Sequence, residues 1–180
     1  MMSAGNAVDF GDLAAVKEKQ GGEVNSSTRG LIYGGGSPRI NTIDYITTAT
    51  TGNASDFGDL VAVIADAHGG GNSTRGIIAG GKTDPGVNTN TIQYITIATT
   101  GNSTDFGDLT QARDSSATMS SPTRMVVAGG WLYPTIYNII DYVQIATTGN
   151  AVDFGDMTHG DATNGLVTAA NGVSNAHGGL

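Results

Sequence analysis

The chain has 180 residues, including 28 glycines and no cysteine, and carries a net charge of −8. This length predicts one domain. The acidic charge argues against a nucleic-acid partner, because binding phosphates needs a basic face. The lack of cysteine excludes disulfides and cysteine-based metal sites. No apolar run approaches a membrane span, and the first six residues do not resemble a signal peptide.

Only 13% of the residues are charged, and Gly, Thr, Ser and Asn fill much of the remainder. Short apolar runs rich in β-branched residues recur between clusters of turn-forming residues. This composition predicts an all-β protein with many turns, because a disordered chain would lack such regular apolar runs.

A phrase of Asp-Phe-Gly-Asp followed by Leu or Met occurs four times and contains every phenylalanine in the chain: Phe10, Phe57, Phe106 and Phe154. Successive phenylalanines are 47, 49 and 48 residues apart. A fixed period of about 48 residues indicates a repeat protein, in which each unit packs against its neighbours. The Asp pairs of these phrases supply half of the acidic residues.

The first full unit begins with residues 14–19, which have helix-forming residues. The equivalent run Val61–Ala67 is apolar and β-branched, so a strand is predicted at both places. Gly21-Gly22 and Asn25–Thr28 then predict a turn.

An apolar run at Arg29–Tyr33 is ended by Gly34-Gly35, and a polar loop follows. Asn41–Ile46 then alternates its side chains between two faces, as a strand does. A Gly-Asn pair predicts the tight turn that leads to the next phrase. Each unit therefore offers four short strands, which suit one antiparallel propeller blade.

The second and third units repeat this order, with glycine-ended strands at Arg75–Ala79 and Arg124–Ala128 and tyrosine strands at Thr91–Ile95 and Ile139–Val143. After Met157 the pattern decays. Thr163–Ala170 matches the glycine-ended strand, but no tyrosine strand follows it. A degenerate last unit is typical of the end of a repeat array.

This order resembles the kelch repeat, in which a strand ends in a double glycine and a later strand carries a spaced tyrosine. The matching tyrosines are Tyr45, Tyr94 and Tyr142. The repeat phenylalanines stand where kelch proteins carry tryptophan, which is a departure from the pattern. The resemblance implies an all-β fold of kelch-like β-propeller repeats of about 48 residues, with antiparallel four-stranded blades.

The expected division is a single domain, 1–180, containing three full blades and a split or partial fourth. The N-terminal partial unit is 1–13, the blades are 14–60, 61–109 and 110–157, and the degenerate C-terminal unit is 158–180. Propellers usually close with four to eight blades. Three and a partial fourth leave two readings open: a minimal ring, or open ends that pair with another copy of the chain.

The amino-acid sequences of the repeats, such as Asn-Thr-Ile-Asp-Tyr-Ile and Ile-Ala-Thr-Thr-Gly-Asn, are similar to repeats in virion structural proteins of marine and cyanobacterial phages. That resemblance implies a tail, fibre or capsid-decoration component located in the virion. The implied partners are other virion proteins, further copies of this chain and host-surface glycan.

The Asp pairs admit two readings. Calcium, a hard cation, is bound by oxygen ligands such as these. Asp side chains also close turns by accepting hydrogen bonds from nearby backbone N–H groups, which is the preferred reading. The eight residues are Asp9, Asp12, Asp56, Asp59, Asp105, Asp108, Asp153 and Asp156.

Arg29, Arg75 and Arg124 occur once per unit and are predicted to pair with a repeat Asp or with backbone carbonyls between blades. A ligand-facing ring of arginines is the alternative. His68, His159 and His177 lack the spacing of metal ligands and are read as loop residues. No catalytic set and no cofactor site is predicted.

The loop after the third double glycine carries three aromatic residues: Trp131, Tyr133 and Tyr137. Exposed aromatic side chains stack on sugars or anchor protein partners, so this loop is the predicted recognition surface. Burial of Trp131 between blades is the competing reading. The leading hypothesis is a non-enzymatic virion structural protein with an assembly or adhesion role. The alternatives are a carbohydrate-binding or carbohydrate-acting propeller of cellular origin, and a cellular kelch adaptor.

Overall fold

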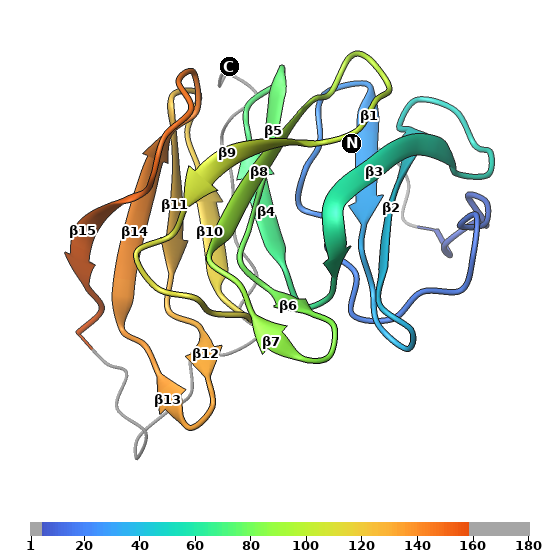
Figure 1. Cartoon of the computed structure of the whole chain (residues 1–180). Coiled ribbons are helices and arrows are strands. Elements are labelled where there is room, and N and C mark those ends of the chain that lie inside the picture. Colours follow the sequence, from blue (N-terminus) through green and yellow to red (C-terminus); the bar gives the residue numbers. More distant parts are fainter. Residues whose placement is uncertain (1–4, 159–180) are drawn as a thin grey trace.

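The computed structural model describes residues 5–158 (Figure 1). The described residues contain fifteen strands and no helix, and every strand pairing among them is antiparallel. The all-β prediction is therefore confirmed. Without a helix, this part of the chain also lacks the long apolar helix that a membrane span requires.

The first sheet contains β1 (Arg29–Tyr33), β2 (Ile40–Thr47) and β3 (Ser55–Ile64), paired in that order. Residues 21–25 extend this sheet beyond β1. Gly21 and Tyr33 exchange two backbone hydrogen bonds of 3.0 and 2.9 Å, and isolated bridges pair Gly21 with Tyr33 and Asn25 with Gly30. The first sheet thus has a short fourth edge segment.

The middle and last sheets have four strands each, in chain order across the sheet. The middle sheet contains β4 (His68–Gly71), β5 (Arg75–Ala79), β8 (Thr91–Thr96) and β9 (Thr104–Asp108). The last sheet contains β10 (Ala117–Ser120), β11 (Arg124–Ala128), β14 (Ile139–Gln144) and β15 (Val152–Asp156). Within each sheet, every strand runs antiparallel to its neighbours.

Two small hairpins interrupt these sheets at the same place in the repeat, directly after the double glycine. They are β6 (Lys82–Thr83) with β7 (Val87–Asn88), and β12 (Trp131–Leu132) with β13 (Thr135–Ile136). Both hairpins project from one end of the stacked sheets, below the large strands in Figure 1. The most variable part of the repeat is therefore collected at that end.

The strand predicted at residues 14–19 is wrong. Within 14–19 only Glu18 forms a bridge, to Gly36, and the equivalent run after Phe57 continues β3 as far as Ile64. The outermost segment of each sheet instead lies further along, at 21–25, β4 and β10. Glycine suits this segment because space is short: a Cβ on Gly69 would lie 2.5 Å from the Tyr33 hydroxyl.

Each repeat phenylalanine of the three sheets is the extra residue of a β-bulge. Ile92 pairs with Gly107 and Gln93 with Asp105, so Phe106 has no partner across the ladder. The same shift occurs opposite Phe57 and Phe154. A bulge re-aims a side chain, and here Phe57 and Phe106 enter the core and are only 2% and 3% exposed.

The core lies between consecutive sheets, which follow one another across the molecule (Figure 1). Leu31 and Ile43 of the first sheet share one apolar cluster with Ile78 of the middle sheet. The opposite face of β5 places Ile77 in a second cluster with Met125 of the last sheet. The middle sheet is thus buried on both faces, which no single unit could achieve alone.

Consecutive sheets are also joined by a recurring clamp, in which a Gly-Asn turn runs along the Phe strand of the preceding unit. Gly149 donates its N–H to the Phe106 carbonyl at 2.7 Å, and Ala151 donates to the Asp108 carbonyl at 2.8 Å. The Asn150 side chain accepts the Asp108 N–H at 3.1 Å. Equivalent clamps are formed by residues 101–103 on β3 and by residues 52–54 on residues 10–12.

The predicted unit boundaries stay predictions. The sheets occupy residues 21–64, 68–108 and 117–156, and β3 crosses the predicted boundary between residues 60 and 61. Nearly all of the predicted C-terminal partial unit, with the strand at Thr163–Ala170, His159 and His177, lies outside the described residues.

Candidate functional site

An Arg-Tyr-Phe stack recurs in all three sheets. Arg75 lies over the Tyr94 ring, with its guanidinium carbon 4.5 Å from the ring centroid. The edge of Tyr94 meets Phe106, at 6.0 Å between centroids. The same arrangement occurs at Arg29, Tyr45 and Phe57, and at Arg124, Tyr142 and Phe154. These nine positions lie within the sheets and at their junctions, as an architectural element of the repeat.

Two of these arginines reach the next sheet. Arg29 donates to the Ile97 carbonyl at 2.8 Å, and Arg75 donates to the Ile145 carbonyl at 2.7 Å. Of the predicted partners, the structure thus places backbone carbonyls, rather than a repeat Asp, at these guanidinium groups. A shallow pocket lies beside Arg75 at this end of the sheets and contains no acidic side chain; its lining is Asn72, Thr74, Arg75, Thr96, Ile145 and Ala146.

The Asp pairs of the repeat phrase lie along the Phe strands. In the two terminal copies, Asp9 and Asp153 accept the N–H of the glycine two residues later, at 3.1 and 2.9 Å. The second Asp contributes its backbone to the clamp through Asp12, Asp59 and Asp108. Within residues 5–158 no three His, Asp or Glu side chains gather closely enough to hold a metal ion.

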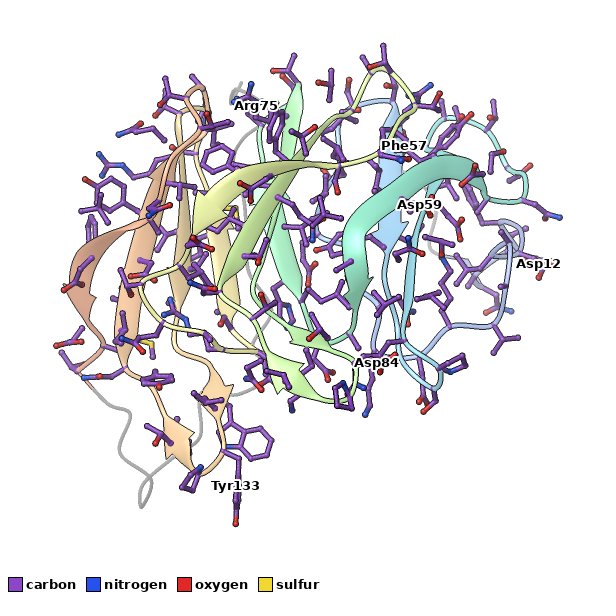
Figure 2. All side chains as sticks on the ribbon, viewed as in Figure 1. Asp12, Phe57, Asp59, Arg75, Asp84 and Tyr133 are labelled. Carbon is purple, nitrogen blue, oxygen red and sulfur yellow. The ribbon has the colours of Figure 1, made fainter. Side chains whose placement is uncertain are left out.

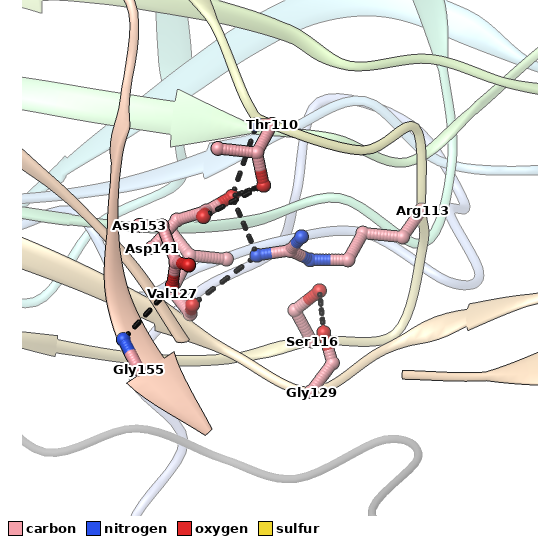
Figure 3. Close-up of polar contacts among 8 residues, drawn as sticks. All are labelled: Thr110, Arg113, Ser116, Val127, Gly129, Asp141, Asp153 and Gly155. Atoms are coloured by element: carbon pink, nitrogen blue, oxygen red, sulfur yellow. Dashed lines mark hydrogen bonds and ion pairs between the residues drawn. The ribbon is translucent and has the colours of Figure 1, made fainter. Parts of the chain in front are cut away.

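A buried ion pair that sequence reasoning missed lies within the last sheet and the segment leading to it (Figure 3). Arg113 and Asp141 are fully buried and 3.0 Å apart, and Arg113 also donates to the Val127 carbonyl. The Asp141 carboxylate accepts the Thr110 hydroxyl at 2.8 Å and the Thr110 N–H at 3.1 Å. Burial lowers the pKa of Arg113, and the neighbouring Asp141 charge opposes that shift. Two other nitrogens of the Arg113 side chain, Nε and Nη1, are buried without a hydrogen-bond partner among the described residues.

The same two positions of the first unit carry Lys17 and Asp44, whose charged atoms are 2.6 Å apart. The second unit carries Ile64 and Gln93 there instead. Gln93 accepts the Val61 N–H at 3.0 Å, as Asp141 accepts that of Thr110. The sequence contained a signal for this ion pair, because the second unit replaces both the basic and the acidic residue, with Ile64 and Gln93.

Glu23, Tyr33 and His68 form a cluster that occurs once in the described residues, where the first and middle sheets meet. The Tyr33 hydroxyl donates to Glu23 Oε2 at 2.7 Å, and His68 Nδ1 lies 2.9 Å from Glu23 Oε1. His68 is therefore part of strand β4 and of a junction between sheets, where a loop position was predicted. In the last sheet, Ala117 and Ala128 stand at the places of His68 and Tyr33.

This cluster is better suited to structure than to acid–base chemistry. Burial raises the pKa of Glu23, but hydrogen bonds from His68 and Tyr33 outweigh that effect and hold the pKa at about 2. Burial raises the pKa of Tyr33 well above its ordinary value, and the adjacent Glu23 charge adds to this. A carboxylate with both oxygens engaged is a poor base, and a phenol that resists ionisation is a poor acid.

The loops after the three double glycines meet along one edge, which we call the loop edge: residues 37–39, 82–88 and 131–137. Arg39 and Asp84 join the first two loops through an ion pair of 2.8 Å. Lys82 lies 4.8 Å from the centroid of the Trp131 ring and pairs with the buried Asp114. Asn88 donates to the Trp131 carbonyl at 2.6 Å. The loop edge is thus a continuous surface made by all three units.

The predicted recognition residues lie on this edge. Tyr133 is 81% exposed and points away from the sheets at the tip of the last hairpin (Figure 2). Its ring meets Trp131 edge-on, at 6.0 Å between centroids. Trp131 and Tyr137 are half-buried, and the Tyr137 N–H bonds to the Gly130 carbonyl. An exposed aromatic residue thus stands beside a partly covered one and a lysine.

Comparison with known proteins gives a likeness in fold only. No protein-family model matches the chain, and no curated protein matches its sequence. The solved structure of YjhT is similar to this chain, with a TM-score of 0.65 and 8% sequence identity. The likeness covers 79% of this chain and 53% of YjhT, so the chain spans about half of that protein.

Proposed function

We propose that this chain is a non-enzymatic structural protein of a phage virion, a tail, fibre or capsid-decoration component with an adhesive role. In this proposal its sheets are blades of kelch-like propeller repeats. The proposal is supported by the order of antiparallel strands in each unit and by the packing of consecutive sheets on one another. The repeated arginines, tyrosines and phenylalanines make contacts within and between the sheets, as expected of a protein whose repeated residues serve its structure.

The observation that carries the adhesive role is the placement of Tyr133 and Trp131 on the loop edge. Variable loops on a rigid scaffold are where binding residues gather, and the side chain of Tyr133, a residue that is 81% exposed, can stack on a sugar ring or a partner side chain. Lys82 lies over the Trp131 ring, and its charge is paired with the buried Asp114. We therefore take host-surface glycan or a neighbouring virion protein as the partner.

The virion role is tested on purified phage particles from the source of the sequence. Mass spectrometry should find the chain in intact particles, and gold-labelled antibody against it should mark one part of the particle in negative-stain images. Absence of the chain from intact particles overturns this role. Glycan binding by a chain found only in cells would instead favour a carbohydrate-binding protein of cellular origin, which the Trp131–Tyr133 pair also suits.

The adhesive role predicts that Tyr133→Ala weakens retention on immobilised host-envelope glycan about tenfold, since an anchoring aromatic contributes about 1.4 kcal/mol or more. Because Tyr133 is exposed, its loss should change the free energy of unfolding by less than about 0.5 kcal/mol. Val87→Ala is the matched control, because Val87 is 60% exposed on the neighbouring hairpin. Equal retention of both variants and the native chain would contradict the role of Tyr133.

A further inference from the structure

Three Phe segments of the described chain receive a clamp, namely residues 10–12 and the strands β3 and β9, and a fourth, β15, receives none from the described residues. The Gly-Asn turns at 52–54, 101–103 and 149–151 clamp residues 10–12, β3 and β9 respectively. Phe57 and Phe106 of the clamped strands β3 and β9 are almost fully buried, and Phe154 of β15 is 58% exposed. Phe10, which is clamped but belongs to no strand, is 37% exposed. β15 therefore offers a strand edge of the same sequence type without the turn that covers its counterparts.

The missing turn is present at the other end of the chain. Residues 5–12 read Gly-Asn-Ala-Val-Asp-Phe-Gly-Asp, which is identical to residues 149–156. In the second copy, Gly149, Asn150 and Ala151 form the clamp on β9. The corresponding Gly5, Asn6 and Ala7 are exposed and clamp no strand of the described residues. The described residues thus contain one Phe strand without a clamp and one clamp sequence without a strand.

The same chain cannot join them while its N-terminal segment keeps its place. Phe10 and Asp12 are hydrogen-bonded to residues 52–54 beside the first sheet, whereas β15 lies at the far side of the last sheet (Figure 1). Residues 10–12 occupy the layer before the first sheet, so three steps of about 10 Å each, about 30 Å along the row, separate them from β15. The five residues 5–9 extend at most about 18 Å. If residues 5–7 clamp β15, they must therefore belong to another molecule.

The face of the last sheet that a second molecule would cover carries apolar and aromatic side chains. Val126, Ile140 and Tyr142 of the last sheet are half-buried. Their counterparts in the middle sheet, Ile77, Ile92 and Tyr94, pack in or against the apolar cluster shared with the last sheet. The chain is also similar in fold to YjhT, which is about twice as long as the matched region. A second copy would supply that further length.

We propose that this protein associates head to tail, with Gly5, Asn6 and Ala7 of one copy clamping β15 of the next. The register follows the three clamps within the chain. Gly5 donates to the Phe154 carbonyl, Ala7 donates to the Asp156 carbonyl, and the Asn6 side chain accepts the Asp156 N–H. The partner is a second copy of this chain, and the inference deepens the proposed scaffold function by naming the surfaces that join its copies.

Substitution of one glycine, Gly155, can block this contact without disturbing the fold of the single chain. A Cβ on Gly107 would lie 2.5 Å from backbone atoms of Gly149 in the observed clamp, whereas a Cβ on Gly155 meets nothing within 4 Å. Gly155→Ala should therefore leave the single chain folded but prevent the clamp. Gly101→Ala is the matched control, because Gly101 also has positive φ and open space around a Cβ, away from the proposed interface.

Sedimentation velocity over a range of protein concentrations measures the effect. The native chain and Gly101→Ala should associate, and Gly155→Ala should associate about tenfold more weakly, since overpacking a close contact costs this much or more. A native chain that stays monomeric throughout, or a Gly155→Ala variant that associates as well as the native chain, overturns the proposal.

Cysteine cross-linking separates contacts between copies from closure within one copy, because the native chain has no thiol. Chains carrying only Ala7→Cys and chains carrying only Asp156→Cys are mixed and oxidised, and a disulfide-linked heterodimer is expected. The pair Ala151→Cys and Asp108→Cys in one chain has the same relationship and calibrates the geometry, since Ala151 bonds to Asp108 at 2.8 Å.

A chain carrying both Ala7→Cys and Asp156→Cys should form linked dimers and higher oligomers. An internally linked monomer would show that the N-terminal segment closes on β15 of its own chain and would overturn the proposal. So would the absence of any mixed dimer when the calibrating pair closes. These outcomes concern assembly alone, because phage particles can contain the chain whether or not its copies join in this way.

Discussion

Glu23 gives the protein a specific sensitivity to acid. Its folded-state pKa of about 2 lies below the ordinary value of 4.5, so the cluster with Tyr33 and His68 stabilises the fold at pH values above about 4.5. That contribution should be lost as the pH falls from about 4.5 to about 2, because the unfolded chain binds the proton more readily. Urea unfolding at a series of pH values measures the loss.

Glu23→Gln should remove this part of the acid dependence, since an amide does not titrate. Glu18→Gln is the matched control, because Glu18 is exposed on the same N-terminal stretch, and it should keep the acid dependence of the native chain. If Glu23→Gln lost stability between pH 4.5 and 2 as steeply as the native chain, another carboxylate would be responsible.

Residues were predictable from the sequence where they recur. Phe57, Tyr94 and Arg75 stand at fixed places in the repeat, and a place occupied by the same side chain in every unit is a packing position. Glu23 and His68 gave no such signal, because each occurs once in its place and they meet only through the fold, 45 residues apart. A contact of this kind depends on how two sheets face each other.

At the scale of the structural element, the ion pair in the last sheet can be tested by copying its neighbour. Arg113→Ile alone leaves Asp141 buried without its cation, and loss of one partner from a buried pair costs about 3–5 kcal/mol. Adding Asp141→Gln recreates the Ile64 and Gln93 combination that the second unit carries. The double variant should regain most of the lost stability, because an amide is less costly to bury than a charge.

Urea unfolding of the two single variants and the double variant completes the cycle. Recovery in the double variant to within about 1–2 kcal/mol of the native chain is expected, since buried pairs are often replaced without large loss. Free-energy changes that simply added would mean that Arg113 and Asp141 stabilise the sheet independently. Thr110 is the internal reference, because its N–H can bond to the amide that Asp141→Gln introduces, as Val61 does to Gln93.

Strands were predictable where apolar residues and turns mark them, as at Arg75–Ala79 and Thr91–Thr96. The outermost segments were not, because β4 consists of one histidine and three glycines, which have poor strand propensity. These residues are extended because β5 supplies hydrogen bonds and the adjacent sheets leave little space beside them. The strand predicted at residues 14–19 rested on their equivalence to Val61–Ala67, but residues 14–19 lie outside the named strands.

At the scale of the whole molecule, the period of the repeat correctly indicated a row of similar sheets. The period could not indicate what covers the outermost sheet, because a repeat describes only how one unit packs on the next. The loop edge is a similar case. The sequence showed three variable loops, but only the packing of the sheets brings Arg39 to Asp84 and Lys82 to Trp131. A recognition surface shared by three units follows from stacking.

The arginines between sheets test whether the row is held by polar contacts as well as by its apolar core. Arg75→Met should lose the bond to the Ile145 carbonyl and the stack on Tyr94, for about 1.5–3 kcal/mol. Arg124→Met, in the last described sheet, loses the stack on Tyr142 and should cost about 0.5–1 kcal/mol. Urea unfolding at low protein concentration compares the two. Equal losses would mean that the bond from Arg75 to the next sheet adds nothing, and that apolar packing and the clamps alone keep consecutive sheets together.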